Sequence, residues 1–329
     1  MTETLFLTSD EVAGLATPAE FVDAVRQGYR QQGPAEPRTK LLNDAPQGML
    51  TGYLAILPET GAMGGYTYAA GFEGGDVHFV LPLFDARSGD PLALIDGASL
   101  NPFKTGATGA VGVDALARED ATTLSIIGTG AQARGQLRAT MTVRDFETVN
   151  VYSPTKEHRE AFASEMNGEY DASVGAVASR DAAVEGADVV VTATTADEPV
   201  FDGGLLEPGT HVTAMGQYDR VKRELDARTV ERATYVLDLR ARAEQDAGAL
   251  IQAIEEGVVG ADHLHGDLGE VLAGDVPGRQ SDEEITVFDS GGTGIETVAA
   301  AYLLYRKAEE EGLGEPIDFA PGSQALTGR

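Results

Sequence analysis

The residues best suited to chemistry in this chain form a glycine turn behind a short apolar run. Residues 123–127 read TLSII and lead into residues 128–133, GTGAQA, which match the pattern G-x-G-x-x-A. Gly128 can make the tight turn out of a strand, Gly130 lets backbone approach a pyrophosphate, and Ala133 allows close packing of a helix on the strand. The phosphates would lie at the positive N-terminal end of that helix. The pattern predicts a dinucleotide-binding turn.

Further apolar runs follow this turn at the spacing of strand-helix-strand units. They include residues 149–152, 187–195, 212–215 and 285–288, with helix-compatible segments between them. Alternation of this kind is typical of a mostly parallel sheet. We therefore expect an α/β fold with a Rossmann-type domain.

The segment before the turn has a different pattern. Thr17 as N-cap, Pro18 at the first helical position and Glu20 two positions on predict a helix. Short strand candidates follow between residues 50 and 95, and a last helix is expected from Ile295 to Glu311. Because 329 residues exceed one average domain, we expect two domains, and the last helix can pack back on the N-terminal half.

Charge is the most unusual bulk property. The chain has 53 acidic and 24 basic residues, a formal net charge of −29, and no cysteine. A nucleic-acid partner is excluded because phosphate backbones need a basic face. The acids are scattered along a chain of normal apolar content, as on proteins from salt-loving microbes. With no disulfide and no apolar run of about 18 residues, a soluble cytoplasmic protein that binds no membrane is expected.

Nine motifs follow one another in a specific order. They are EPRT (36–39), LFDARSGDPLALIDG (83–97), KT (104–105), IIGTGAQA (126–133), ADVVVTATT (187–195), HVTAMG (211–216), RELD (223–226), LGEVLAG (268–274) and VFDSGGTGIE (287–296). In these motifs the chain resembles the ornithine cyclodeaminase/mu-crystallin family over nearly its whole length. Together with the charge, this suggests a haloarchaeal-type member.

The resemblance implies an NAD(P)H-dependent oxidoreductase that acts on a small amino acid or its imine, as imine reductases and alanine dehydrogenases do. It also implies a homodimer. The expected domains are a discontinuous α+β substrate-binding and dimerisation domain, residues 1–118 completed by 295–329, and the Rossmann domain, residues 119–294.

The same resemblance assigns substrate-binding residues. Arg38 matches the arginine that binds the substrate carboxylate, and a guanidinium offers a bidentate fork for that group. Lys104 occupies the position where the family usually has a second arginine. A lysine there keeps the positive charge but cannot bind both oxygens of a carboxylate as a guanidinium does. Tyr68 is a further substrate-binding candidate.

One departure concerns proton transfer. The family's lysine in a G-x-K element is absent, because no lysine occurs between Lys40 and Lys104. Asp219 is the preferred proton donor, with Lys104 as a second catalytic candidate; Tyr66, Tyr68 and His78 are alternatives. The missing lysine weakens the ornithine cyclodeaminase alternative, which needs several proton transfers. A cofactor-binding, non-catalytic crystallin-like protein is the other alternative.

The cofactor choice is expected to depend on the second turn, SPTK (153–156). No carboxylate is present there to bind a ribose 2′-hydroxyl, whereas hydroxyls and cations could receive a 2′-phosphate, so NADP is favoured over NAD. The residues expected to bind the cofactor are Thr105, Gly128, Gly130, Ala131, Gln132, Ser153, Thr155, Lys156, Thr194, Thr195, Met215, Gly216, Ser290 and Gly292. No metal is expected, since His263 and His265 suit a solvated loop.

Overall fold

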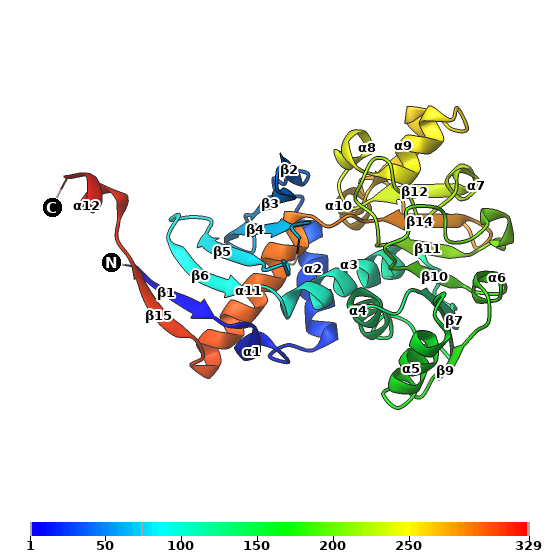
Figure 1. Ribbon diagram of the computed structural model, residues 1–329, viewed down its shortest axis with the longest axis horizontal. Coiled ribbons are helices and arrows are strands. Elements are labelled where there is room, and N and C mark those ends of the chain that lie inside the picture. Colours follow the sequence, from blue (N-terminus) through cyan, green and yellow to red (C-terminus); the bar gives the residue numbers. More distant parts are fainter. Residues whose placement is uncertain (1, 74, 328–329) are drawn as a thin grey trace. The chain divides into compact units, whose positions relative to one another are not determined.

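The computed structural model describes residues 2–73 and 75–327 (Figure 1). The chain divides into two compact units, one of residues 1–104 with 293–329 and the other of residues 105–292. This division falls within helix α3 (Leu100–Leu116), whereas the expected domain boundary lay after the helix. Within the described ranges, none of the helices has both the length and the apolarity needed to span a membrane.

The second unit is built on one parallel sheet of eight strands. Its order is β13-β12-β14-β11-β10-β7-β8-β9. The strands are β7 (Thr123–Ile127), β8 (Thr148–Tyr152), β9 (Ser173–Ala176), β10 (Val189–Thr192), β11 (His211–Ala214), β12 (Ala233–Leu237), β13 (Leu264–Asp267) and β14 (Ile285–Asp289). The first of them, β7, lies between β8 and β10, so the strand order reverses there.

Both faces of this sheet are buried, as the near-continuous apolar strands require. Val189 and Val191 of β10 belong to one hydrophobic core with residues of α3, α4 and α5. Val190 points to the other face and a second core, with residues of α6, α7 and α9. The helices of this unit beyond α3 are α4 (Ala131–Thr140), α5 (Lys156–Met166), α6 (Arg180–Val184), α7 (Ala227–Arg232), α8 (Arg242–Gln245), α9 (Gly248–Glu255) and α10 (Leu268–Ala273), with short 3₁₀ helices η1 (Gly203–Leu205) and η2 (Ala261–His263).

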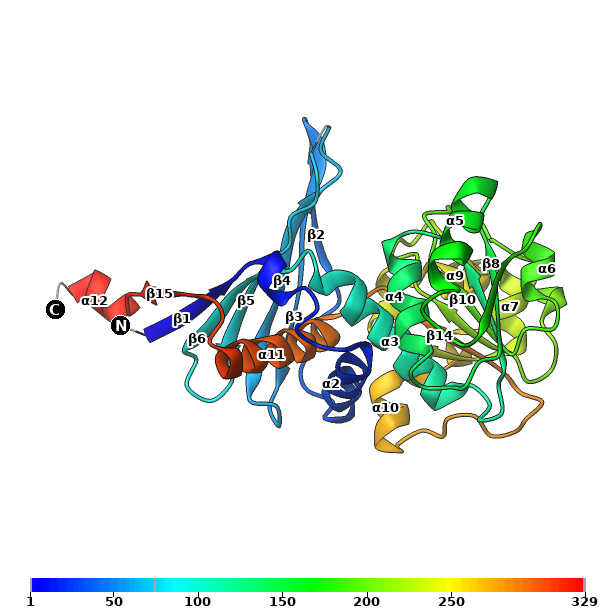
Figure 2. The ribbon, with the colours of Figure 1, turned by 90° about the horizontal axis from the view of Figure 1, so that it is seen from below.

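The first unit contains a seven-stranded mixed sheet in the order β15-β1-β6-β5-β4-β3-β2. Its strands are β1 (Thr2–Leu7), β2 (Thr39–Asp44), β3 (Gln47–Leu57), β4 (Ala62–Ala70), β5 (Val80–Asp85), β6 (Pro91–Asp96) and β15 (Glu315–Phe319). Helix α11 (Gly294–Glu311) lies along the face of this sheet, beside β3 and β4 (Figure 2). The unit's other helices are α1 (Ser9–Val12), α2 (Pro18–Arg30) and α12 (Gly322–Thr327).

Local signals account for the helix ends of this unit. Thr17 and Glu20 form a capping box before α2, with Pro18 at its start, which confirms the predicted helix start. Thr293 and Glu296 form a capping box at the start of helix α11. Strands β1, β2 and β15 were not predicted. The pairs of β1 with β6 and β15 join segments far apart in the sequence, whereas β2 forms a hairpin with β3.

Candidate active site and dinucleotide pocket

The glycine turn lies at the carboxyl end of β7. Gly128 has φ 122°, and a Cβ there would lie 2.3 Å from the carbonyl oxygen of Ala193. Gly130 is the N-cap of α4 with φ −79°, and a Cβ there would meet no atom within 4 Å. The fold therefore requires glycine at position 128, whereas the space beside Gly130 is open to a ligand.

A pocket of about 620 Å³ opens beside this turn. It is lined by residues 127–130, 152–155 and 193–200, which follow β7, β8 and β10, and by His158 and Arg180. In open parallel sheets, ligands bind at the carboxyl ends of the strands where the strand order reverses. The pocket has this position, and its open glycine turn fits the pyrophosphate of a dinucleotide.

The predicted cofactor residues fall into two groups. Those that line the pocket are Gly128, Gly130, Ser153, Thr155, Thr194 and Thr195. Those outside its lining are Thr105, Ala131, Gln132, Lys156, Met215, Gly216, Ser290 and Gly292. Ala131 and Gln132 begin α4 directly behind the turn, and the backbone carbonyl of Thr105 accepts a hydrogen bond from Gln136 at 2.8 Å. Their contacts with a cofactor stay predictions.

A buried carboxylate, Glu224, connects the loops that follow β10 and β11. It accepts hydrogen bonds from the backbone N–H and hydroxyl of Thr194 at 2.7 and 2.6 Å and from the hydroxyl of Thr192 at 2.9 Å. It also accepts one from the backbone N–H of Gly216 at 2.8 Å. Burial raises the pKa of Glu224, and these hydrogen bonds oppose that shift. Glu224 thus fixes two loops in which cofactor contacts were predicted.

The turn after β8 is organised by its own polar groups. The buried Ser153 donates to the carbonyl of Thr155 at 3.1 Å, and Arg159 donates to the carbonyl of Ser153 at 2.8 Å. The Arg159 guanidinium also lies over the Tyr152 ring, 5.7 Å from its centre. Lys156 is exposed on α5, and its Nζ lies 3.6 Å from Glu160.

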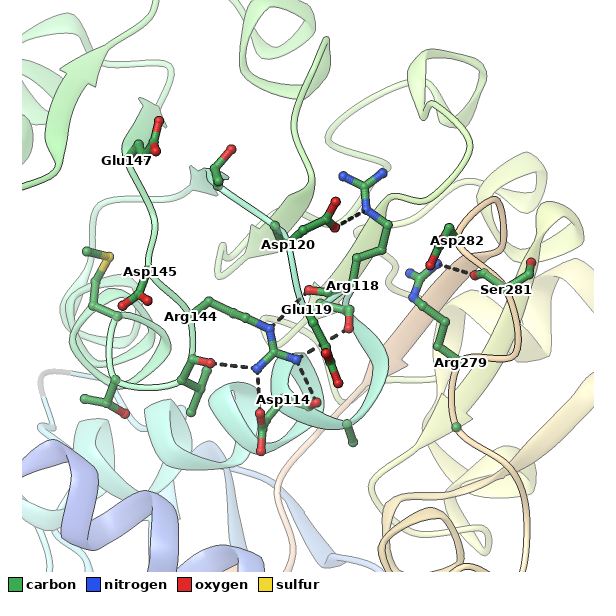
Figure 3. Close-up of a pocket in the computed structure, with 18 of the residues that line it drawn as sticks. Asp114, Arg118, Glu119, Asp120, Arg144, Asp145, Glu147, Arg279, Ser281 and Asp282 are labelled. Carbon is green, nitrogen blue, oxygen red and sulfur yellow. Dashed lines mark hydrogen bonds and ion pairs between the residues drawn. The ribbon is translucent and has the colours of Figure 1, made fainter.

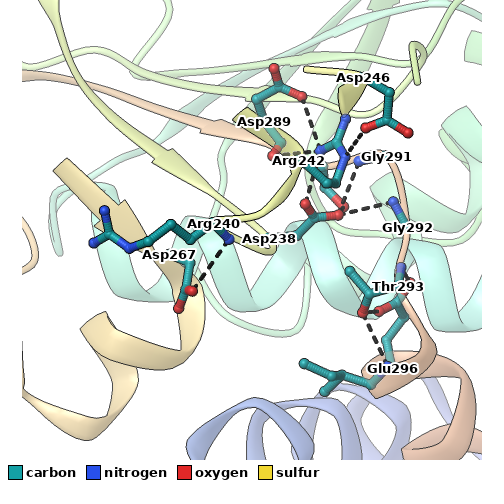
Figure 4. Close-up of polar contacts among 12 residues, drawn as sticks. Asp238, Arg240, Arg242, Asp246, Asp267, Asp289, Gly291, Gly292, Thr293 and Glu296 are labelled. Atoms are coloured by element: carbon teal, nitrogen blue, oxygen red, sulfur yellow. Dashed lines mark hydrogen bonds and ion pairs between the residues drawn. The ribbon is translucent and has the colours of Figure 1, made fainter. Parts of the chain in front are cut away.

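The loop Ser290–Gly292 follows β14 and is held by Asp238 (Figure 4). One carboxylate oxygen of Asp238 accepts from the Ser290 hydroxyl and from the next two backbone N–H groups, at 2.7 to 3.0 Å. The other accepts from Arg242 at 2.8 Å, and Arg242 pairs with Asp246 at 2.7 Å. This loop is therefore fixed from within its own unit.

In the first unit, Arg38 is a buried cation on an aromatic wall. Its side chain donates to the Tyr68 hydroxyl at 2.9 Å, and its guanidinium lies 5.0 Å from the centre of the Tyr53 ring. Only 5% of Arg38 is exposed. A guanidinium held in this way on an aromatic wall can offer a bidentate fork to a carboxylate.

Lys104 lies against the same ring. Its Nζ is 5.2 Å from the centre of the Tyr53 ring, donates to the Tyr53 hydroxyl at 3.2 Å and pairs with Glu296 at 3.1 Å. Glu296 also accepts from the hydroxyls of Tyr29, at 2.9 Å, and Thr293. Burial lowers the pKa of Lys104, but Tyr53 and Glu296 outweigh it and the pKa is raised. Lys104 is therefore a fixed ammonium and no base.

The proton-donor candidates occupy different settings. Asp219 is half-buried in the loop after β11, where it accepts from the backbone N–H of Val221 at 3.1 Å. Tyr66 is fully buried and donates to the carbonyl of Gly97 at 3.0 Å; burial raises its pKa well above the usual value. His78 is exposed. These contacts leave the choice of donor a prediction.

The imidazoles of His263 and His265 contact different backbone carbonyls, of Val230 at 2.6 Å and Pro277 at 2.8 Å. Across the described residues, no three histidine, aspartate or glutamate side chains gather as a metal site.

Another hollow of the second unit, about 1110 Å³, lies at the amino ends of β7, β8 and β14 (Figure 3). Three arginines line it, each bonded within the protein. Arg144 pairs with Asp114 at 2.6 Å, Arg118 with Asp188 at 2.6 Å, and Arg279 donates to backbone carbonyls. These contacts hold the three cations against the loops before β7, β8 and β14.

Several residues of both sites were not identified from the sequence. Glu224 and Glu296 occur within motifs quoted above, but their contacts join segments distant in the chain. His158 and Arg180 reach the pocket from α5 and from the first residue of α6, and no local pattern marks either one.

Comparisons with known proteins show the family of this chain. The family model described as the ornithine cyclodeaminase/mu-crystallin family matches residues 3–312. A Δ1-pyrroline-2-carboxylate reductase of Bacillus cereus is 38% identical over 244 residues, 74% of this chain and 75% of that protein.

Two solved structures are similar over almost the whole chain. The Thermococcus litoralis Δ1-pyrroline-2-carboxylate reductase with NADH and L-proline has a TM-score of 0.90 and 32% identity, covering 95% of this chain and all (100%) of that one. An archaeal alanine dehydrogenase dimer with bound NAD has a TM-score of 0.89 and 31% identity, covering 97% and 100%.

Proposed function

We propose that this chain, which belongs to the ornithine cyclodeaminase/mu-crystallin family, reduces a cyclic imino acid of the Δ1-pyrroline-2-carboxylate type to the matching amino acid. In reaction class it is an NAD(P)-dependent oxidoreductase that acts on a small amino acid or its imine. The observation that carries the finer proposal is the buried Arg38 on the aromatic wall of Tyr53 and Tyr68, which suits a carboxylate attached to an apolar ring.

The two alternatives expected from the sequence are set aside. The similar proteins described above are reductases and a dehydrogenase, which favours imine reduction over ornithine cyclodeamination or a non-catalytic crystallin-like role.

In this proposal, reduction adds a hydride to the imine carbon and a proton to the nitrogen, so the C=N bond becomes a C–N bond. The bound nicotinamide supplies the hydride. Arg38 holds the carboxylate, and Lys104, kept protonated beside Glu296, adds a second positive charge. Asp219 stays our proposed proton donor.

We propose NADP(H) as the preferred cofactor. The pocket wall formed by Ser153, Pro154 and Thr155 at the end of β8 has no carboxylate to accept a hydrogen bond from a ribose 2′-hydroxyl. Of the two similar structures described above, one is described with NADH and one with NAD.

The test is a screen of NADPH and NADH oxidation in molar KCl with Δ1-pyrroline-2-carboxylate, its six-membered homologue, and pyruvate or oxaloacetate with ammonia. We expect the cyclic imines to react fastest and to yield L-amino acids. Faster turnover of pyruvate with ammonia would instead identify an alanine dehydrogenase. Formation of proline and ammonia from ornithine would support ornithine cyclodeaminase activity.

We also propose a homodimer formed through the outer face of the first unit's sheet. Along β3, Thr51, Tyr53 and Ala55 are buried on one face, whereas Leu50 and Leu54, which point to the other face, are 48% and 59% exposed. Leu41 of the neighbouring β2, which pairs with Leu50, is also exposed. Contiguous exposed apolar side chains of this kind mark an interaction surface.

We expect Leu54→Glu to convert the dimer into a monomer, because a carboxylate would be buried without a partner in the interface. Light scattering after size-exclusion chromatography measures this. Val258→Glu, at an exposed apolar residue of the other unit, is the matched control and should leave the mass unchanged. If the Leu54→Glu variant remained a dimer with the affinity of the wild type, the interface would have to lie elsewhere.

The acidic composition leads us to propose a protein adapted to high salt. At a net charge of −29, carboxylates repel one another in dilute buffer, whereas the Debye length falls to about 3 Å at 1 M salt. We expect the melting temperature to rise by roughly 10 °C or more from dilute buffer to molar KCl. Sucrose, which strengthens apolar burial without screening, should stabilise far less. Equal stabilisation by both would argue against charge screening.

A further inference from the structure

Four basic side chains lie near the turn after β8, and they differ in whether they line the pocket or already have bonded partners. They are Lys156, His158 and Arg159 of α5, and Arg180, the first residue of α6. An adenosine ribose would lie beside this turn in a dinucleotide bound at β7 and β8. Which of the four can reach a ligand therefore bears on the choice between a ribose 2′-phosphate and a 2′-hydroxyl.

Two of the four are turned away from the pocket or already bonded. Lys156 does not line the pocket; its side chain is 66% exposed and its Nζ faces Glu160 on the next helical turn. Arg159 is half-buried over Tyr152 and donates to the carbonyls of Ser153 and Pro154, so it stabilises the turn. Neither is placed to contact a phosphate in the pocket.

The other two line the pocket. Arg180 and His158 are both exposed and both contribute to its wall. Within residues 2–73 and 75–327, neither side chain has a hydrogen bond or an ion pair. They approach the pocket from different helices, α5 and the start of α6, and line it together with Ser153–Thr155. A guanidinium with free N–H groups beside an imidazole is a suitable set of donors for a phosphate.

The same pocket contains two carboxylates, both in the loop after β10. Asp197 pairs with Lys222 at 2.6 Å, which leaves Glu198 as the acidic side chain able to compete. Glu198 lies on the segment after β10, whereas Arg180 and His158 lie on the β8 and β9 side. The adenosine side of the pocket is thus basic.

We propose that Arg180, with His158 beside it, binds the 2′-phosphate of the adenosine ribose and makes this chain select NADP(H). This assignment rests on the proposed dinucleotide site and moves the specificity contact from Lys156 to Arg180. The guanidinium is the main contact and the imidazole adds a hydrogen bond. The same ion pair would be absent with NAD(H), whose ribose has only a hydroxyl group.

The test measures binding without turnover. Dissociation constants for NADPH, NADH, 2′,5′-ADP and 5′-AMP are measured by calorimetry for the wild type and for Arg180→Ala, His158→Ala, Lys156→Ala and Glu198→Gln. We expect Arg180→Ala to weaken NADPH and 2′,5′-ADP roughly tenfold or more and to change NADH and 5′-AMP less than about twofold. His158→Ala should have a smaller effect of the same kind. Lys156→Ala is the matched control, since it removes a nearby positive charge that does not line the pocket, and it should change nothing.

Each other outcome has a distinct meaning. If Arg180→Ala weakened the binding of NADPH and NADH equally, Arg180 would contact a group that both dinucleotides share, and the proposal would be overturned. A Lys156→Ala variant that binds NADPH more weakly but NADH normally would overturn it as well. So would a wild type that binds NADH more tightly than NADPH together with a Glu198→Gln variant that binds NADH more weakly. A wild type that reduces imines with NADH alone would leave the proposed reaction standing and remove the specificity assignment. Because Arg180 is exposed, we expect an unchanged melting temperature in Arg180→Ala.

Discussion

Gly130→Val is expected to abolish dinucleotide binding and to leave the fold intact. The backbone of Gly130 has φ −79° and ψ −173°, which a valine adopts without strain, and its Cβ would enter space where no protein atom lies within 4 Å. That space is where the pyrophosphate must approach the turn. Loss of two hydrogen bonds to a charged group costs roughly a factor of 100 or more in affinity. Fluorescence titration with NADPH and NADH measures it.

Two other glycines provide controls for this prediction. Gly175 of β9 also lacks atoms within 4 Å of its Cβ position and does not line the pocket, so Gly175→Val should bind cofactor normally. Gly128→Val should instead unfold at lower temperature, because of its φ of 122° and the backbone oxygen 2.3 Å away. Native cofactor affinity in folded Gly130→Val would falsify the placement of the site.

The elements predicted well are those whose signals are local. The glycine turn at 128–130 and the capping box of Thr17 with Glu20 need only neighbouring residues, since a turn or a helix end is formed within a few positions. The buried strands of the second unit were recognisable for the same reason, as apolar runs between turns. The α/β class follows from these runs.

The contacts that organise the sites could not be predicted in this way. Glu224 bonds Thr194, and Glu296 bonds Lys104, across 30 and 192 positions of sequence. Arg180 reaches the pocket only because β9 pairs with β8. Such proximity is a product of the folded sheet order, and the residue types alone, in a chain with 53 acidic side chains, are not distinctive. Lys156 illustrates the limit, because nothing in the sequence of the turn indicates that its side chain is exposed beside Glu160.

Arg38→Ala is expected to lower kcat/KM for Δ1-pyrroline-2-carboxylate by at least roughly 30-fold. Removal of one partner of a buried, hydrogen-bonded charge pair costs about 2 to 5 kcal/mol, and each 1.4 kcal/mol is a factor of about 10. Arg38→Lys should recover only part of the loss, because an ammonium cannot bind both carboxylate oxygens as a fork. Steady-state kinetics with saturating cofactor measure both variants.

Two comparisons separate carboxylate binding from a general structural effect. With 1-pyrroline, a cyclic imine without a carboxylate, wild type and Arg38→Ala should react at similar, slow rates, because the group that Arg38 binds is missing. Tyr68→Phe removes the hydroxyl that accepts from Arg38 at 2.9 Å and should cause a smaller loss with the carboxylate substrate, since the guanidinium keeps its charge and its position over Tyr53. Dinucleotide affinity should not change in any of the three variants. Equal losses with both imines would mean that Arg38 supports the fold of its unit and does not bind the substrate carboxylate.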